Sequence, residues 1–221
     1  MISVVMITMN EESAVGTVID AIRESTPDAE IVIVDSSEDR TPEIAESMGA
    51  KVIRQFPPRG YGRAMDLALR SASGDVIVTM DCDNTYPADM IPEVSRMVLS
   101  GEYDLVDCSR LKNKPVAMPW PNFIVNKLFA WIASLLFLER FTDLHSGMRA
   151  YSRQVIESTE WDPEGAALPV ELLLVPYRRG FRVGTVFIEY HERLGDSKMK
   201  AFETSYMTLK RMMRTRFGGR R

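Results

Sequence analysis

The first half of this chain alternates short runs rich in valine and isoleucine with longer helix-like stretches. The strand-like runs are Ser3–Thr8, Glu30–Asp35, Lys51–Arg54, Asp75–Met80 and Tyr103–Cys108. The helix-like stretches are Ala14–Ser25, Thr41–Met48, Gly62–Ala72 and Ala88–Leu99. This alternation predicts βαβ units, and strands that are apolar along their whole length are typical of a mostly parallel sheet with helices on both faces. We therefore expect an α/β fold.

Polar residues collect in the loops after three of these runs. They are Thr8, Asn10 and Glu11 after the first run, residues 35–39 after the second and residues 81–84 after the fourth. Because ligands of such sheets bind at the carboxyl ends of the strands, we expect a site at this edge. The hydroxyls of Ser36, Ser37 and Thr41 fit a purely structural role equally well, since helix N-termini need such caps.

The second half of the chain is more interrupted. It contains a proline-rich connection at Lys112–Pro121, helix-like stretches at Asn122–Leu138 and Ala167–Arg179, and a short strand at Arg182–Ile188. We expect no separate core there, and a length of 221 residues suits one α/β domain with a short appendage. We predict one domain over residues 1–199 and a tail over residues 200–221.

The segment GDVIVTMDCDNTYP ends an apolar strand in two acidic residues, Asp81 and Asp83. Two carboxylates at the end of a buried strand repel each other and are poorly solvated, so they need a cation. Mg²⁺ or Mn²⁺ held by oxygen ligands keeps open positions for the phosphates of a substrate. This pair therefore predicts a metal-dependent enzyme that acts on a nucleoside diphosphate compound.

Whole-chain properties limit the partners and the compartment. The net charge of -4 gives no indication of nucleic-acid binding. Cys82 and Cys108 lack metal-ligand spacing, and the N-terminus lacks the features of a secretory signal, so we expect free thiols in the cytoplasm. The apolar run Leu128–Leu138 would form a helix about 16 Å long, too short for a hydrocarbon core of about 30 Å. It fits either a buried core helix or a helix in the membrane interface.

The tail is basic and amphipathic. Residues 210–221 contain six lysine or arginine residues and no acid. In a helix from Phe202 to Phe217, the apolar side chains that lean to one side are Phe202, Tyr206, Leu209, Met213 and Phe217. This pattern predicts an interfacial helix that attaches the protein peripherally to the cytoplasmic face of a membrane. A tail that serves solubility or binds a protein partner is the alternative, and the sequence specifies no oligomeric state.

Five segments resemble a known family in their order and spacing. They are ITMNEE, VDSSEDRTPEIAE, RGYGRAMDLALRSASGDVIVTMDCDNTYPADMIPE, DLHSGMRAYSR and RLGDSK. Together they resemble the inverting glycosyltransferases of family 2, and most of all the branch of dolichyl-phosphate mannose synthases and polyprenyl-phosphate glycosyltransferases. The similarity runs from about Val4 to Lys198. It implies a Rossmann-like GT-A fold, with residues 1–110 as the nucleotide-sugar half and residues 111–199 as the acceptor half.

The resemblance implies roles on the donor side, where a UDP- or GDP-hexose would bind with Mg²⁺ or Mn²⁺. Asp35 would contact the base or ribose, and Thr8, Asn10 and Glu11 would line the same pocket. Gly60 and Arg63 would lie near an anion at the start of a helix. Asp81 would lie nearer the nucleotide, and Asp83 would be the direct metal ligand. An Asx-turn is the alternative for Asp35, and a solvated side chain is the alternative for Arg63.

On the acceptor side, the resemblance implies a cationic seat for the phosphate of a dolichyl or polyprenyl phosphate. Its members would be Arg110, Arg149, Arg193, Ser197 and Lys198. Asp143 would shape the floor of the site with Ser146 and Gly147, and it is also a possible base. His145 is a further acceptor-site candidate, and Glu171 would orient a basic residue. The family more often has alanine in place of Cys82 and a Gln-His pair within residues 84–86.

Chemistry favours a phosphate acceptor. A sugar hydroxyl must lose a proton during attack and needs a general base, whereas a lipid phosphate is already anionic near neutral pH and needs cations instead. We therefore expect in-line attack of a lipid phosphate oxygen on the anomeric carbon, with inversion. A soluble glycosyltransferase with a small hydroxyl acceptor and Asp143 as base is the first alternative. A non-catalytic nucleotide-sugar sensor or membrane scaffold is the second.

Overall fold

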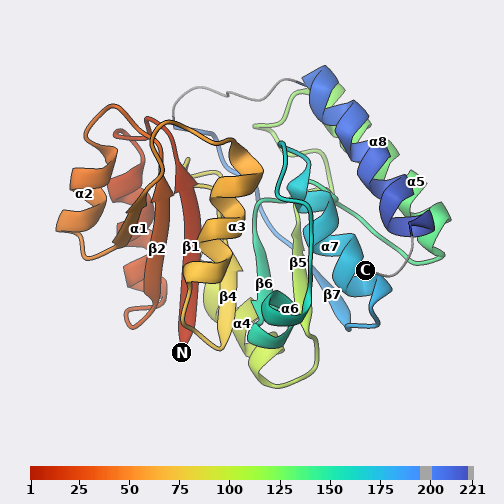
Figure 1. Ribbon diagram of the computed structural model, residues 1–221, viewed down its shortest axis with the longest axis horizontal. Coiled ribbons are helices and arrows are strands. Elements are labelled where there is room, and N and C mark those ends of the chain that lie inside the picture. The colour runs from red at the N-terminus through yellow and green to blue at the C-terminus, as the bar shows by residue number, and fades with distance from the viewer. Residues whose placement is uncertain (195–200, 219–221) are drawn as a thin grey trace.

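The structure, a computed structural model, describes residues 1–194 and 201–218, and the side chains of residues 204–218 in the second range. A seven-stranded sheet in this part of the chain has the order β3-β2-β1-β4-β6-β5-β7 (Figure 1). The strands are β1 (Ile2–Thr8), β2 (Glu30–Asp35), β3 (Lys51–Arg54), β4 (Val76–Thr79), β5 (Leu105–Ser109), β6 (Arg149–Ser152) and β7 (Val183–Phe187). All pairings are parallel except the two that β6 makes. The predicted α/β fold with a mostly parallel sheet is confirmed.

Helices cover both faces of the sheet (Figure 1). They are α1 (Val15–Ser25), α2 (Thr41–Ser47), α3 (Tyr61–Ser71), the 3-10 turn η1 (Ala88–Met90), α4 (Ile91–Leu99), α5 (Trp120–Phe137), α6 (Arg153–Ser158), α7 (Leu168–Arg178) and α8 (Ala201–Phe217). Along β1, Val4 and Met6 pack with α1 and α4, whereas Val5 packs with α3 on the opposite face. Both faces of the strand are buried, which explains why its sequence is apolar throughout.

Strand β6 was not predicted. It lies antiparallel between β4 and β5, where Ala150 is paired with Val78 on one side and with Val106 on the other. Four residues that begin with an arginine give too short and too polar a pattern to be recognised as a buried strand. The insertion of β6 brings the preceding loop, residues 143–148, to the edge of the sheet where β4 ends.

Helices α5 and α8 lie side by side, and α8 also packs on α7 (Figure 1). Both helices were predicted within two residues of their observed ends. The polarity of α8 is inverted relative to a typical surface helix. It buries Thr204, Thr208, Arg211, Met212 and Thr215, and it exposes Tyr206, Leu209, Met213 and Phe217. Among the described residues, no helix combines the length and hydropathy that a bilayer span requires.

Candidate active site

Asp35, at the carboxyl end of β2, is enclosed by protein donors. Its Oδ1 accepts hydrogen bonds from the hydroxyls of Thr8 and Ser37, each at 2.6 Å. Its Oδ2 accepts the backbone N–H of Ser37 at 3.0 Å and forms an ion pair with Arg54. The side chain is fully buried. The bond from Ser37 N–H is the Asx-turn contact of the structural alternative, so Asp35 joins the ends of β1, β2 and β3.

The loop after β1 is hydrogen-bonded to the loop after β2. The Asn10 backbone N–H donates to Ser37 Oγ at 2.8 Å, and the Asn10 side-chain oxygen accepts the Glu38 N–H at 2.8 Å. The Glu11 N–H donates to Thr41 Oγ1 at 2.9 Å. Asn10 adopts the left-handed conformation, with φ of 57°, which an asparagine tolerates better than most residues. Ser37 and Thr41 therefore have a structural role, but their hydroxyls join two loops at the rim, and α2 has no side-chain cap hydrogen bond.

Gly60 and Arg63 lie at the start of α3. Gly60 has φ of +91°, a conformation that favours glycine, and it immediately precedes the helix. Arg63 forms an ion pair with Glu164, and both side chains are at least half exposed. A Cβ atom on Gly62 would collide with the backbone oxygen of Pro163, so another loop covers the first turn of α3. Arg63 is thus half exposed and paired with Glu164, as in the solvated alternative, and its binding of an anion stays a prediction.

Asp81 and Asp83 follow β4, and both lie at the same rim. Burial, together with the charge of Asp83, raises the pKa of Asp81 to about 6. Asp83 Oδ1 accepts the backbone N–H of Thr85 at 3.1 Å and also its hydroxyl, whereas Asp83 Oδ2 contacts Arg193 Nη2 at 2.7 Å. Burial is the largest influence and lowers the pKa of Arg193, but Asp83, Asp81 and Tyr190 together outweigh it, so the pKa is raised.

This pair fits a divalent ion. The charge of Asp83 contributes to the raised pKa of Asp81, and a protein cation, Arg193, is already paired with Asp83. The part of the chain that the structure describes has no cluster of three or more histidine, cysteine or acidic side chains suited to a metal. Mg²⁺ and Mn²⁺ are commonly held by one or two carboxylates, with substrate phosphates and water as further ligands, and Asp81 and Asp83 would suit such an ion.

At Gly147, the loop before β6 packs closely against the Asp81 side chain. A Cβ atom on Gly147 would lie 2.5 Å from Asp81 Oδ2. The Gly147 N–H donates to the Tyr86 hydroxyl at 2.6 Å. The Tyr86 ring meets the Tyr190 ring edge to face, with centroids 5.6 Å apart. Tyr86 and Tyr190 were not predicted as site residues, and the signal for Tyr86 was its departure from the Gln-His pair of the family.

Arg110 and Asp143 form a buried bidentate pair. Arg110 Nε donates to Asp143 Oδ2 at 2.7 Å, and Nη2 donates to Oδ1 at 3.0 Å. The backbone N–H groups of Arg110 and His145 also donate to this carboxylate. Burial is the largest influence and raises the pKa of Asp143, but the charge and hydrogen bonds of Arg110 together with the charge of His145 outweigh it, so the pKa is lowered. Asp143 therefore stays ionised and holds Arg110, whose guanidinium lies 5.3 Å from the Tyr190 ring centroid.

Arg149 does not lie where the prediction required. Its side chain is 1% exposed and forms an ion pair with Asp107. Its remaining nitrogens donate to the backbone oxygens of Asp143, Leu144 and Pro169. Because these partners occupy both ends of the guanidinium inside the core, the expected role of Arg149 in binding an acceptor phosphate is corrected to a structural one.

The remaining candidates either contact α8 or lie outside the described residues. His145 Nε2 lies 2.8 Å from Thr208 Oγ1 of α8, and burial lowers the pKa of His145 to about 4. Glu171 forms ion pairs with Arg211, at 3.0 Å, and with Arg214, which agrees with its expected role in orienting basic residues. Ser197 and Lys198 lie outside the described residues.

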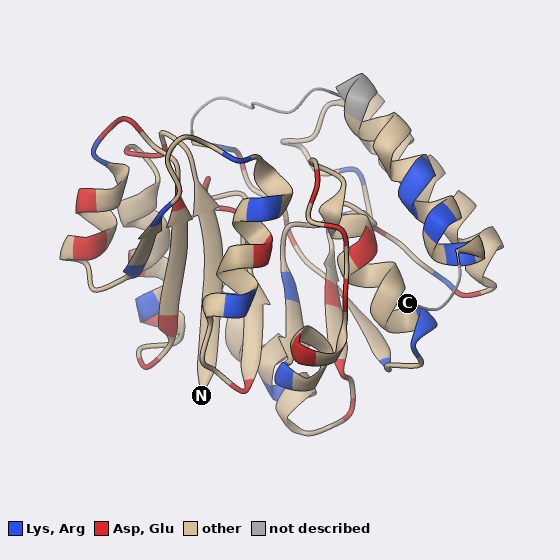
Figure 2. Ribbon diagram, in the orientation of Figure 1, with Lys and Arg blue, Asp and Glu red and all other residues tan. Residues whose placement is uncertain are grey.

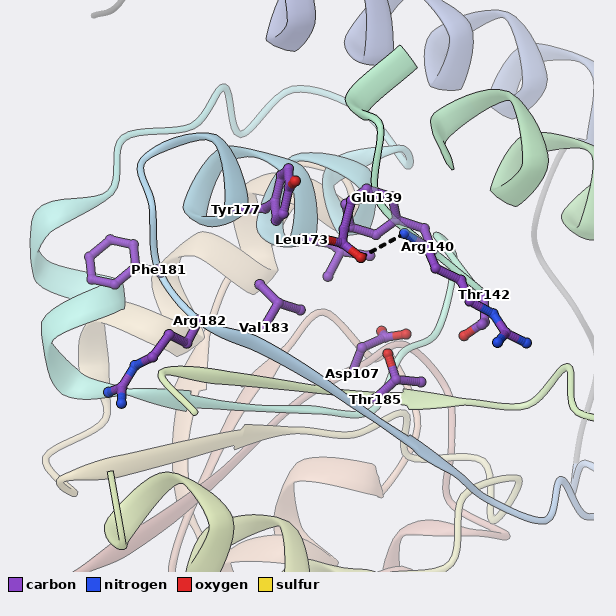
Figure 3. A pocket seen from close by; sticks show the side chains of 11 residues that line it. Asp107, Glu139, Arg140, Thr142, Leu173, Tyr177, Phe181, Arg182, Val183 and Thr185 are labelled. Carbon is purple, nitrogen blue, oxygen red and sulfur yellow. Dashed lines mark hydrogen bonds between the residues drawn. The ribbon is translucent and has the colours of Figure 1, made fainter. Parts of the chain in front are cut away.

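A cavity of about 320 Å³ lies apart from this rim, beside β5, β7 and α7 (Figure 3). Its lining includes Asp107, Arg140, Thr142, Tyr177, Arg182 and Thr185. Asp107, the partner of Arg149, faces it, but Asp35, Asp81 and Asp83 do not contribute to its wall. We therefore place the candidate active site at the carboxyl ends of β1, β2 and β4 rather than in this cavity.

The family model Glycosyl transferase family 2 matches residues 3–159. A dolichyl-phosphate hexose transferase of Haloferax volcanii is 43% identical over 202 residues, which cover 91% of this chain and 87% of that protein. A dolichol-phosphate mannosyltransferase of Pyrococcus furiosus is 29% identical over 220 residues, covering 90% of this chain and 59% of that protein.

The fold is also similar to a solved structure of glucosyl-3-phosphoglycerate synthase from Mycobacterium tuberculosis, in complex with Mn²⁺, UDP and glucosyl-3-phosphoglycerate. The TM-score is 0.77 at 25% sequence identity, with 97% of this chain and 79% of that chain covered. The complex of the same enzyme with phosphoglyceric acid gives a TM-score of 0.76 at 26% identity, with the same two shares covered.

Proposed function

Since this chain is a glycosyltransferase of family 2 with the GT-A fold, we propose that it transfers a hexose from a UDP- or GDP-linked donor to a dolichyl or polyprenyl phosphate, with inversion and with Mg²⁺ or Mn²⁺. The observation that carries this proposal is the meeting of the Asp81 and Asp83 carboxylates with the cation of Arg193 at one rim. Acidic groups for a metal and basic groups for a phosphate are thus available together.

Asp81 and Asp83 are the proposed metal ligands, with Asp83 Oδ2 as the direct one. A divalent ion held there would stabilise the charge on the departing nucleoside diphosphate as a Lewis acid. The similar solved structure contains Mn²⁺ and UDP together, which supports this pairing. Thr85 donates to Asp83 Oδ1 and so aims Oδ2 toward the ion.

The acceptor is proposed to be a lipid phosphate because the site offers cations but no available base at Asp143. That carboxylate accepts four hydrogen bonds from Arg110 and His145 and is held ionised. Arg110 and Arg193 are the described cations nearest the metal ligands, and Lys198 remains a proposed third. The relative from Haloferax volcanii is named for a dolichyl-phosphate hexose transfer, which supports the same acceptor.

The second candidate is transfer to a small hydroxyl acceptor that also carries a phosphate, as in 3-phosphoglycerate. It is favoured by the similar fold of a glucosyl-3-phosphoglycerate synthase with phosphoglyceric acid bound. That reaction would need a base, and Asp143 would have to leave Arg110 to serve as one. The geometry of Asp143 therefore favours the lipid phosphate.

Membrane attachment is proposed to occur through α5 and α8 together. The outer side of α5 exposes apolar residues at helical spacing, namely Trp120, Ile124, Leu128, Trp131 and Leu135. Beside it, α8 exposes its own apolar residues, and Arg216 of α8 donates to the backbone oxygen of Leu136. Lys210 and Arg216 of α8 are also exposed, and basic residues are distributed along this helix (Figure 2).

Exposed apolar helices that also expose cations suit the interface of an anionic membrane. Of the two interpretations of the apolar run 128–138, this exposure supports the interfacial one. We propose peripheral attachment to the cytoplasmic face, where nucleotide sugars are available.

The test is a panel of UDP- and GDP-hexoses with a short polyprenyl phosphate and either Mg²⁺ or Mn²⁺, scored by the mass of the product. We expect one donor to give a lipid-phosphate-linked hexose, and Asp83→Ala to abolish transfer while its unfolding curve matches the wild type. Transfer to 3-phosphoglycerate but not to the lipid would establish the second candidate. Failure to form lipid-linked product with every donor would overturn the proposal.

A further inference from the structure

Arg193 binds the one carboxylate oxygen of Asp83 that Thr85 does not engage. Thr85 engages Oδ1 through its N–H and its hydroxyl, and Arg193 Nη2 lies 2.7 Å from Oδ2. The Asp83 side chain is 4% exposed, so solvent does not neutralise it. The guanidinium of Arg193 thus places a positive charge at the oxygen that a divalent ion would bind.

The backbone beside Arg193 is anchored independently of the ion pair. The His191 N–H donates to the Thr85 oxygen at 3.0 Å, and the Leu194 N–H donates to the Asp83 oxygen at 3.0 Å. The Arg193 side chain is 33% exposed, so it has solvent on one side. It can therefore leave Asp83 by rotating, without release of the backbone.

We propose that Arg193 is an exchangeable counter-ion, displaced from Asp83 by the metal ion and then free to bind a phosphate of a substrate. This inference rests on the proposed function, because it takes Asp81 and Asp83 to be the metal ligands. A guanidinium and a divalent ion compete for Oδ2, since both are positive and repel each other at that distance. The displaced guanidinium stays near the site because residues 191 and 194 are anchored.

Through this exchange, Arg193 becomes available to bind a phosphate only when the metal ion is bound. Without the ion, Arg193 is neutralised by Asp83 and offers little charge to an incoming phosphate. With the ion bound, the same guanidinium has lost its partner and faces the rim. Binding of a phosphate and binding of the metal should therefore favour each other.

The first experiment measures Mn²⁺ binding to the full chain without nucleotide, from the electron paramagnetic resonance signal of free Mn²⁺. We expect Arg193→Gln to bind Mn²⁺ about tenfold more tightly than the wild type, because a competing charge is gone. Arg193→Lys keeps a cation and should remain near the wild type. Arg182→Gln is the matched control, since it removes an arginine paired with Asp104 away from the rim. Equal or weaker Mn²⁺ binding by a folded Arg193→Gln would overturn the exchange.

The second experiment uses the wild type and follows arginine modification by phenylglyoxal, with peptide masses as the readout. We expect Mn²⁺ alone to increase the modification of Arg193 at least severalfold and to leave Arg182 unchanged. Adding UDP or a short polyprenyl phosphate in separate arms should then protect Arg193, and the protecting arm identifies the phosphate as the diphosphate or the lipid headgroup.

The outcomes separate the two proposals. If the wild type binds no Mn²⁺ even with nucleotide, the metal-dependent function fails, and the exchange fails with it. If the wild type binds Mn²⁺ with UDP but Arg193 reacts equally with and without the ion, only the exchange is overturned.

Discussion

Arg149 and Asp107 form an ion pair between directly opposed residues of β6 and β5, with 2.6 Å between Nε and Oδ1. Both side chains are at most 2% exposed. Burial raises the pKa of Asp107 to about 6, so the carboxylate is still ionised near neutral pH. The other nitrogens of Arg149 hold the backbone oxygens of residues 143, 144 and 169, and thereby the loop that leads to the active site.

Replacing Arg149 alone should destabilise the fold strongly. Arg149→Met leaves Asp107 as an unpaired buried charge, and breaking such a pair costs about 3–5 kcal/mol of unfolding free energy. The double variant Arg149→Met with Asp107→Leu should lose less than Arg149→Met alone, because no charge is stranded. Urea unfolding at pH 7.5 checks both. A double variant that is less stable than the single one would contradict the structural role given to the pair.

Gly147→Ala should weaken metal binding with little loss of stability. The added Cβ would lie 2.5 Å from Asp81 Oδ2, so the Asp81 carboxylate must move away from its position. We expect at least a tenfold weaker Mn²⁺ affinity in the presence of UDP, measured by calorimetry. Gly16→Ala is a suitable control, because a Cβ there meets no atom closer than 3.7 Å. Unchanged Mn²⁺ affinity in Gly147→Ala would mean that Asp81 is not a metal ligand.

Asp143→Asn distinguishes a positioning residue from a general base. The amide cannot accept both Arg110 donors as the carboxylate does, so Arg110 loses its orientation. We expect a several-fold higher KM for the acceptor and a kcat that retains the wild-type dependence on pH. A general base would instead give a large fall in kcat and remove the acid-side pKa from the pH profile, because a base acts only when it is deprotonated. Steady-state kinetics from pH 5.5 to pH 8.5 separates these outcomes.

Charges on the outer side of α5 and α8 should abolish membrane binding. Trp131→Asp and Met213→Asp each place a carboxylate in the exposed apolar surface, where Trp131 is 60% exposed. Sedimentation with vesicles that contain anionic lipid should show at least a tenfold loss of bound protein for either variant. Leu99→Asp, at an exposed position on α4, is the control and should bind as the wild type does. Transfer to a short, soluble polyprenyl phosphate should persist in all three.

His145 should make the protein less stable as the pH falls. Burial lowers its pKa to about 4, whereas in the unfolded chain it protonates near pH 6.5. Between these values the unfolded state binds the extra proton, so the unfolding free energy falls with decreasing pH by up to about 1.4 kcal/mol per pH unit. The difference between the wild type and His145→Asn should shrink over this range and stay constant above pH 7. A difference that is independent of pH between 4 and 7 would contradict the buried, neutral histidine.

The strands with continuous apolar runs could be predicted because both of their faces are buried, as at Val4 and Val5 of β1. Strand β6 could not, since its four residues are placed by their neighbours in the sheet rather than by a pattern of their own. The closeness of the Asp81 and Asp83 carboxylates could also be predicted, because only one residue separates them in the sequence.

The carboxylate partners of the predicted arginines could not be predicted from the sequence. Arg149 and Arg193 both looked like cations for a phosphate, yet one is paired with Asp107 inside the core and the other with Asp83 at the rim. Which carboxylate each arginine meets depends on the crossing of chain segments more than forty residues apart. The contact of Gly147 with Asp81 and Tyr86 has the same origin.

The position of β6 between β4 and β5 bears on how this enzyme can be rearranged. A strand from residues 111–199 is hydrogen-bonded on both sides to strands from residues 1–110. The two stretches therefore share one sheet and should unfold as one cooperative unit. Fragments cut near residue 110 would each leave open strand edges and should not fold alone. Grafting the acceptor side of a relative onto this chain would likewise require the matching surfaces of β4 and β5, so chimeras should be cut outside this interleaved region.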